Sequence, residues 1–174
     1  PDIEYRIDLP DAPVILECDG RLVSQALTNI LKNAAEAIHG REGDGEGDNG
    51  EEDGKKELQE IRNDSRVGRI HIALVADENR ITVIVTDSGC GLPETDRSRL
   101  TEPYMTTRTK GTGLGLAIVN KVMEDHGGEL VLEDAPVAEG WESGARISWC
   151  FRTTVDRKKM LQMEQAAKRP HRRT

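Results

Sequence analysis

Three glycines stand at alternate positions in residues 111–116, which read GTGLGL, and an apolar, helix-like run follows at once. Glycine weakens the start of a helix, so a requirement other than helix stability should set the residue choice. The backbone N–H groups at a helix N-terminus bind anions, and glycine lets an anion approach them closely. The stretch therefore predicts a phosphate site, although a helix start packed tightly against a sheet would explain the same residues.

Two further residue types suit a nucleotide. Asp87 opens the stretch DSGCG at the end of a predicted strand. Its carboxylate can accept an N–H from an exocyclic amine such as that of adenine, and Gly89 and Gly91 would let a flat base come close. Asn33 lies on a predicted helix, and its amide oxygen is a hard ligand of the kind that Mg²⁺ shares with phosphates. Taken singly, each residue has a simpler explanation, since Asp often caps a glycine turn and a helical Asn is usually solvated.

Apolar periodicity predicts the elements that would hold these residues. Helical spacing covers residues 21–39 and 113–125, with Asp19 as the N-cap of the first helix. Alternating residues predict strands over 3–9, 69–76, 80–87, 129–134 and 144–151. This order of strands and helices predicts an α+β fold, a two-layer sandwich in which a mixed, mostly antiparallel sheet carries helices on one face.

Composition limits both the class of protein and its surroundings. The 174 residues suit a single domain, and because only 3% are aromatic, the core is expected to consist of Ile, Val, Leu and Ala. Residues 152–174 carry a net charge of +6, which leaves −14 on the remainder of a chain whose net charge is −8. An acidic body argues against a nucleic-acid partner. Three cysteines without a CxxC pair fit a reducing cytoplasm.

Two polar segments interrupt the predicted domain, residues 1–151. Seven of the twelve residues in 42–53 are acidic and four are glycine, so a flexible insertion is expected over 42–66. Residues 95–112 are polar and are expected to form a mobile lid over the phosphates. Residues 152–174 are interpreted as a separate basic tail.

Four motifs occur together in a fixed order, and as a set they resemble the histidine kinase family. Asn29-x-x-x-Asn33 resembles its N box, DSGCG its G1 box, TEPYMTTR (101–108) its F box and GTGLGL its G2 box. The resemblance spans about residues 3–151 and implies the Bergerat ATP-binding fold, which gyrase, Hsp90 and MutL share. Within the family, residues 102–136 look most like the nitrogen-regulation sensor kinases.

The resemblance implies a role for each matching residue. Asn33 would coordinate Mg²⁺ with support from Asn29, and Arg108 or Lys110 would neutralise the γ-phosphate and so contribute to catalysis. The complete set implied for ATP is Asn29, Asn33, Glu36, Ala37, Asp87, Gly89, Gly91, Tyr104, Thr107, Arg108, Lys110, Gly111, Thr112, Gly113, Leu114, Gly115 and Leu116.

Two positions depart from the family pattern. Tyr104 replaces a usual Phe, and its ring is expected to pack as the Phe does. Glu36 stands where many relatives have Lys or Arg. A carboxylate there would repel ATP unless it points away from the phosphates or helps to hold Mg²⁺.

One position separates two activities within this fold. By resemblance, the hydrolysing members have a Glu four residues before the Mg²⁺-binding Asn, and that Glu activates water. Asn29 stands there in this chain, and an amide cannot accept the proton at neutral pH. The sequence therefore favours a kinase that transfers phosphate to a histidine. An ATP hydrolase or ATP-driven clamp, and a nucleotide-binding module without catalysis, remain alternatives.

The family resemblance also implies partners. None of the four histidines has the sequence context of a phosphoacceptor, so that histidine is expected on a separate dimerisation domain of the parent kinase. From there phosphate would pass to an NtrX-like response regulator. The domain is expected in the cytoplasm, as part of a parent protein that is anchored in the inner membrane.

Overall fold

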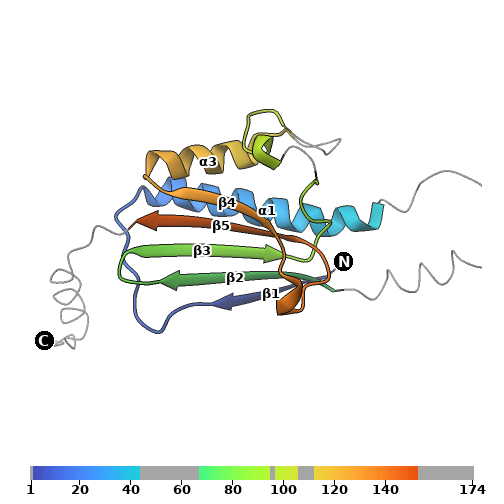
Figure 1. The fold of residues 1–174 in the computed structure, drawn as a ribbon, viewed down its shortest axis with the longest axis horizontal. Coiled ribbons are helices and arrows are strands. Elements are labelled where there is room, and N and C mark those ends of the chain that lie inside the picture. Colours follow the sequence, from blue (N-terminus) through green and yellow to red (C-terminus); the bar gives the residue numbers. More distant parts are fainter. Residues whose placement is uncertain (1, 44–66, 95–96, 106–111, 153–174) are drawn as a thin grey trace, which may run out of the picture.

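A computed structural model describes residues 2–43, 67–94, 97–105 and 112–152 (Figure 1). The strands are β1 (Ile3–Asp8), β2 (Gly68–Ala76), β3 (Arg80–Asp87), β4 (Glu129–Asp134) and β5 (Ala145–Arg152). The helices are α1 (Gly20–Gly43) and α3 (Gly115–Asp125), with short 3₁₀ turns η1 (Arg97–Arg99) and η2 (Val137–Glu139). All five predicted strands are present, and each boundary agrees with its prediction to within one residue.

The five strands form one sheet in the order β1-β2-β3-β5-β4. The edge strand β1 runs parallel to β2, and every other neighbouring pair is antiparallel. In the β2–β3 hairpin, the Asp77 side chain accepts the backbone N–H groups of Asn79 and Arg80, both at 2.8 Å. The predicted mixed, mostly antiparallel sheet is therefore confirmed.

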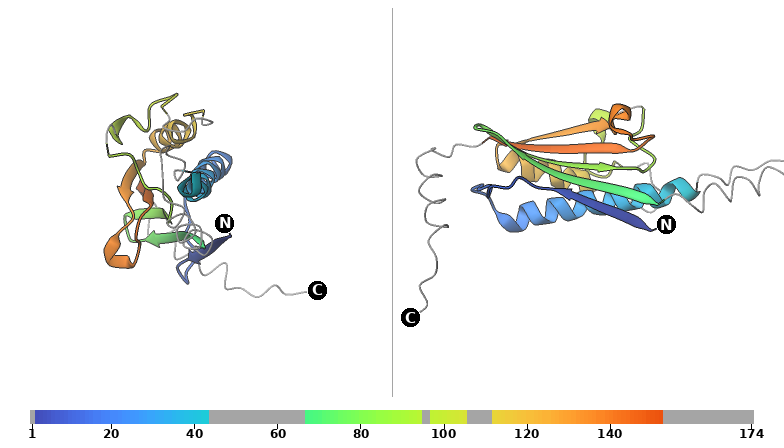
Figure 2. Two further views of the ribbon diagram at one scale, coloured as in Figure 1. Left: turned by 90° about the vertical axis from the view of Figure 1, so that its right-hand side faces the viewer. Right: turned by 90° about the horizontal axis from the view of Figure 1, so that it is seen from below.

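Helices α1 and α3 lie on the same face of the sheet and pack against each other (Figures 1 and 2). The core between the layers includes Ala26, Ile30, Ala34 and Ile38 of α1, Val119, Val122 and Met123 of α3, and Ile70, Val85, Ile147, Trp149 and Phe151 of the sheet. The two-layer sandwich is confirmed. The expectation of a purely aliphatic core is wrong, because Trp149 and Phe151 alternate along β5 toward the helices and are 1% and 2% exposed.

The N-terminal end of α1 is capped as predicted. Asp19 Oδ1 accepts the backbone N–H of Arg21 at 2.9 Å and that of Leu22 at 3.3 Å. These bonds, the one from Arg21 first, hold the pKa of the Asp19 carboxyl below its ordinary value. At its other end α1 continues to Gly43, four residues beyond the predicted end, so the acidic stretch begins inside the helix. The remainder of the predicted insertion lies outside the described residues.

Helix α3 starts at Gly115, two residues later than predicted, and its last turn is attached to the start of α1. The Asp19 backbone N–H donates to His126 Nε2 at 3.0 Å, while His126 Nδ1 lies 2.7 Å from the carbonyl of Val122. A ring nitrogen that accepts an N–H carries no proton, so Nδ1 is the protonated nitrogen and donates to Val122. Gly127, with φ of +62°, then turns the chain away from the helix as predicted.

Candidate functional site

Asn33 of α1 lies against Gly115, the first residue of α3. A Cβ built on Gly115 would lie 3.4 Å from Asn33 Nδ2 and 3.5 Å from Oδ1. Even a methyl group at position 115 would therefore be in contact with the carboxamide. The predicted metal-binding amide and the predicted phosphate-binding glycine stretch, which lie far apart in the sequence, are brought together by the packing of α1 on α3.

Asp87 ends β3 with its side chain only 3% exposed. Its Oδ1 accepts the backbone N–H of Gly89 at 2.8 Å and that of Ala145 at 3.3 Å. A buried carboxylate is tolerated when it is hydrogen-bonded in this way. Both bonds restrict rotation of the carboxylate, so its second oxygen has a defined direction.

The turn after Asp87 packs closely on α1. A Cβ on Gly89 would lie 2.6 Å from the Cβ of Ala37, and the Cys90 N–H donates to the Ala37 carbonyl at 3.3 Å. Gly91 has φ of +82°, where glycine is the favoured residue. Ala37, which the resemblance included among the nucleotide residues, thus forms the helix side of this turn.

The segment before α3 is built on backbone contacts. Gly113 has φ of +65°, and a Cβ there would lie 2.5 Å from the Tyr104 carbonyl carbon. The Tyr104 N–H donates to the Gly113 carbonyl at 3.0 Å. Leu114 takes the N-cap position of α3 and provides no side-chain hydrogen bond to the first turn. The first N–H groups of α3 therefore have no side-chain cap, as an anion site at a helix start requires.

The expectation that the Tyr104 ring packs like a Phe is wrong. Tyr104 is 78% exposed and has φ of 67°, in the left-handed region that few residues other than glycine adopt. The backbone of Tyr104 and Met105, rather than an aromatic ring, occupies the space beside Gly113. Thr112 is exposed nearby, whereas Leu116 is partly buried against the core.

The other polar residues of α1 differ in their surroundings. Glu36 is exposed, and its carboxylate lies 3.8 Å from Lys32 Nζ. Asn29 Nδ2 is buried and has no hydrogen-bond partner among the described residues. A buried N–H donor without a partner costs about 1–3 kcal/mol, so such a group is a candidate to donate a hydrogen bond to a bound ligand.

Four predicted nucleotide residues, Thr107, Arg108, Lys110 and Gly111, lie outside the described residues.

The donor set fits Mg²⁺ as it is usually held beside phosphates. Among the described residues, no group of three or more His, Cys, Asp or Glu side chains could hold a metal ion. Mg²⁺ in phosphate-transfer sites keeps several waters and takes one or two protein oxygens together with phosphate oxygens. Asn33 Oδ1, beside the start of α3, is a suitable single oxygen for that arrangement.

Sequence reasoning missed several contacts that shape this region. Gly144, which matches a glycine at the start of the family's last strand, has φ of +127° and contacts the Asp87 carbonyl so closely that a Cβ would not fit. The buried Thr86 hydroxyl accepts a bond from Arg146 Nε at 3.2 Å. Arg97 binds both Asp134 and the carbonyl of Pro93. No pattern in the sequence signals these contacts, because each joins segments that only the folded sheet brings together.

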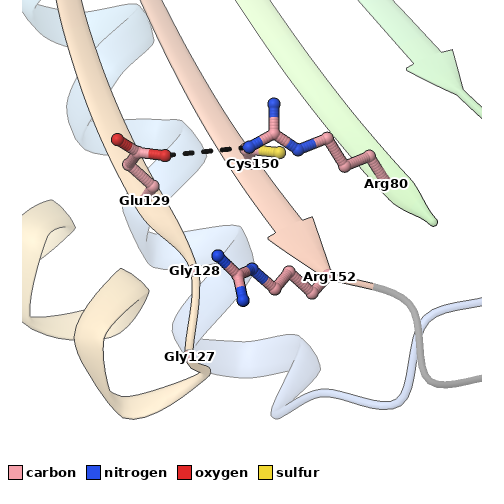
Figure 3. A pocket seen from close by; sticks show the side chains of 6 residues that line it. All are labelled: Arg80, Gly127, Gly128, Glu129, Cys150 and Arg152. Carbon is pink, nitrogen blue, oxygen red and sulfur yellow. Dashed lines mark ion pairs between the residues drawn. The ribbon is translucent and has the colours of Figure 1, made fainter.

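A separate shallow pocket of about 340 Å³ lies at the opposite end of α3 (Figure 3). It is lined by Arg80, Gly127, Gly128, Glu129, Cys150 and Arg152, and Arg80 and Glu129 form an ion pair beside it at 3.9 Å. Because α3 has 11 residues, its two ends are about 16 Å apart. None of the predicted nucleotide residues lines this pocket, so it is a different place from the candidate site.

No helix in the described part of the chain has both the length and the apolar character needed to span a membrane.

Comparisons with known proteins agree on one family. Residues 18–155 match the family described as histidine kinase-, DNA gyrase B-, and HSP90-like ATPase. The chain is 44% identical over 140 residues to nitrogen regulation protein NtrY of Azorhizobium caulinodans, covering 80% of the chain and 16% of NtrY. It is 30% identical over 133 residues to sporulation kinase E of Bacillus subtilis, covering 76% of the chain and 14% of that kinase. The chain thus spans only a small part of these relatives.

Solved structures give the same result. The mycobacterial sensor histidine kinase MprB superimposes with a TM-score of 0.64 at 26% identity, covering 87% of this chain and 82% of that one. The catalytic domain of histidine kinase ThkA gives a TM-score of 0.62 at 25% identity, covering 86% and 80%. The chain therefore belongs to the histidine kinase-, DNA gyrase B- and HSP90-like ATPase family, on its sensor histidine kinase branch.

Proposed function

We propose that this domain binds Mg-ATP beside Asn33 and Gly115 and transfers the γ-phosphoryl group to a histidine on a separate dimerisation domain. The observation that carries the proposal is the position of the Asn33 carboxamide beside the glycine that opens α3, where a Cβ on Gly115 would lie within 3.5 Å of it. It supports the proposal because an amide oxygen, a hard ligand of the kind that Mg²⁺ takes, would lie beside a helix start whose first N–H groups suit phosphate.

The adenine end of the nucleotide is assigned to Asp87 and the turn that follows it. Two backbone N–H bonds orient one carboxylate oxygen, and a carboxylate oriented in this way can accept an N–H from the exocyclic amine of the base. Gly89 and Gly91 keep the turn free of side chains. Asn29, with its buried amide donor, lies one helical turn from Asn33 and supports it.

The phosphates are assigned to the start of α3, with Arg108 or Lys110 providing positive charge at the γ-phosphate. Mg²⁺, when bound, neutralises charge that the phosphates carry and develop during transfer. The chain itself contributes by holding the nucleotide in line with the acceptor, since phosphoryl transfer depends mainly on positioning and charge stabilisation. In the transfer, the bond from the γ-phosphorus to the bridging oxygen breaks while an imidazole nitrogen bonds to phosphorus.

The absence of a carboxylate base at position 29 favours transfer over hydrolysis. An amide at that position can orient a neighbour but cannot take a proton from water. Bound ATP would then persist until the acceptor histidine arrives. The similarity to NtrY supports a parent that is a membrane-anchored nitrogen-regulation kinase and passes phosphate to an NtrX-like response regulator.

One experiment tests the proposal against its alternatives. The chain is incubated with radiolabelled Mg-ATP, alone and with a purified histidine-bearing helical hairpin from the parent kinase. Label on the hairpin that requires the chain supports the kinase. Rapid release of phosphate without the hairpin would establish a hydrolase instead, and nucleotide binding without either reaction would establish a binding module.

A further inference from the structure

We propose that Arg97 is a positioning residue that holds the base-binding turn, residues 87–93, against the β4–β5 edge of the sheet through Asp134. The inference rests on the proposed nucleotide site and adds to it a residue outside the family motifs. Arg97 lies in η1, just after that turn, and Asp134 is the last residue of β4.

All three guanidinium nitrogens of Arg97 are engaged. Nη1 and Nη2 donate to the two carboxylate oxygens of Asp134, each at 2.9 Å, and Nε donates to the Pro93 carbonyl at 2.8 Å. The paired contacts fix the plane of the guanidinium as well as its distance from Asp134. The third bond connects that fixed plane to the last residue of the turn, so the turn cannot move away from β4 while the pair is intact.

The other end of the turn is held by the same two strands. Asp134 pairs in register with Ala145 of β5, and the Ala145 N–H donates to Asp87 Oδ1. The Ser143 hydroxyl donates to the Gly89 carbonyl at 3.1 Å, in the middle of the turn. The contacts therefore form a closed ring that runs from Asp87 through Ala145, Asp134 and Arg97 back to Pro93.

The ring affects ligand binding more than overall stability. The Arg97 and Asp134 side chains are 37% and 61% exposed, and exposed pairs contribute little to global unfolding. If the turn adopts its binding conformation only part of the time, however, the apparent Kd equals the intrinsic Kd divided by the fraction of molecules in that conformation. We call the Arg97–Asp134 pair, with its bond to Pro93, the clamp. Its loss should weaken nucleotide binding roughly threefold to tenfold.

The experiment measures Mg-ADP binding by calorimetry for the chain and for Arg97→Ala, Arg97→Lys, Asp134→Ala and the Arg97→Ala/Asp134→Ala double variant. Both single alanine variants should raise Kd by similar factors. The double variant should bind Mg-ADP no more weakly than either single variant, because all three variants lose the same ring of contacts. Arg97→Lys should remain impaired, since an ammonium cannot make the paired contact. The nucleotide-free melting temperature should change little.

Arg6→Ala is a matched control. Arg6 also makes a two-point contact with an aspartate, Asp8, with distances of 3.2 and 2.9 Å, but on the opposite edge strand β1. Its removal should leave Kd at the wild-type value. A wild-type Kd in Arg97→Ala, or additive losses in the double variant, would overturn the clamp.

Amide hydrogen exchange in nucleotide-free protein separates this inference from the proposed function. Arg97→Ala should speed exchange at Gly89 and Cys90 relative to wild type and Arg6→Ala. Unchanged exchange there contradicts the clamp even if the chain binds ATP. If wild-type protein bound no nucleotide, the proposed function would be wrong. The exchange result alone would then show whether Arg97 holds the turn. Arg97→Lys serves for both measurements should Arg97→Ala fail to fold.

Discussion

Gly144 packs directly against the backbone carbonyl of Asp87, so closely that position 144 has no room for a Cβ. This approach brings the following residue, Ala145, within reach of the Asp87 carboxylate, which its N–H holds at 3.3 Å. The orientation of the proposed adenine acceptor therefore depends on a glycine that immediately precedes a different strand, β5.

Gly144→Ala should destabilise the fold and abolish nucleotide binding, because β5 must move away from Asp87 to admit the methyl group. Its φ of +127° adds backbone strain. We expect a loss of at least about 3 kcal/mol in the free energy of unfolding, measured by urea titration. The control is Gly140→Ala, which has a positive φ of +82° but open space around it, and should cost only about 1–2 kcal/mol. Equal losses in the two variants would show that strain, not contact, dominates at position 144.

Asp87→Asn should weaken adenine-nucleotide binding by at least about tenfold while the fold is kept. The amide oxygen can still accept the N–H groups of Gly89 and Ala145, but an NH₂ group then replaces the second oxygen and meets the base amine donor to donor. Calorimetry with ADP measures the loss, and circular dichroism verifies the fold. Binding at wild-type strength would exclude Asp87 as the base acceptor.

Asn33→Ala should remove the dependence of nucleotide affinity on Mg²⁺. The wild-type chain should bind ATP more tightly with Mg²⁺ than with EDTA, and the variant should bind equally in both, because the protein oxygen for the ion is gone. Thr28→Ala is the control on the same helix, since Thr28 is exposed and its hydroxyl donates to the Ser24 carbonyl within α1. A variant at position 33 that still responds to Mg²⁺ would place the metal ligand elsewhere.

Asp19 should make stability depend on acid pH. Its pKa is lowered in the folded state by the N–H groups of Arg21 and Leu22, so its contribution is fully present above its unfolded pKa. It is lost as pH falls through the lower folded pKa. Asp19→Asn should keep the cap at neutral pH yet flatten the decline of melting temperature as pH falls below the unfolded pKa of aspartate. An unchanged acid profile in the variant would mean that other carboxyls control the decline.

Local patterns predicted most of the fold. Periodicity located every strand to within a residue, because alternation of buried and exposed side chains is a property of each strand alone. Asp19 and Asp77 were predictable for the same reason, since a cap or turn involves only neighbours in the chain. The four ordered motifs also linked Asn33, Asp87 and Gly115 in one predicted site.

Other features followed from no local pattern. The exposed ring of Tyr104 results from the way its backbone packs on Gly113, and the burial of Trp149 results from the face of β5 that the helices cover. Arg97 and Asp134 are unremarkable in sequence, yet their contact joins η1 to the end of β4.

For this chain, the sequence by itself determined which segments are helices and strands, and it indicated which residues are candidates for a nucleotide site. Only the tertiary structure decided that Asn33 faces Gly115, that Gly144 presses on Asp87, and that Arg97 reaches Asp134. The reason is physical: periodicity and capping depend on residues a few positions apart. Contacts across a sheet or between two helices depend instead on register and packing, which are set by the whole chain at once.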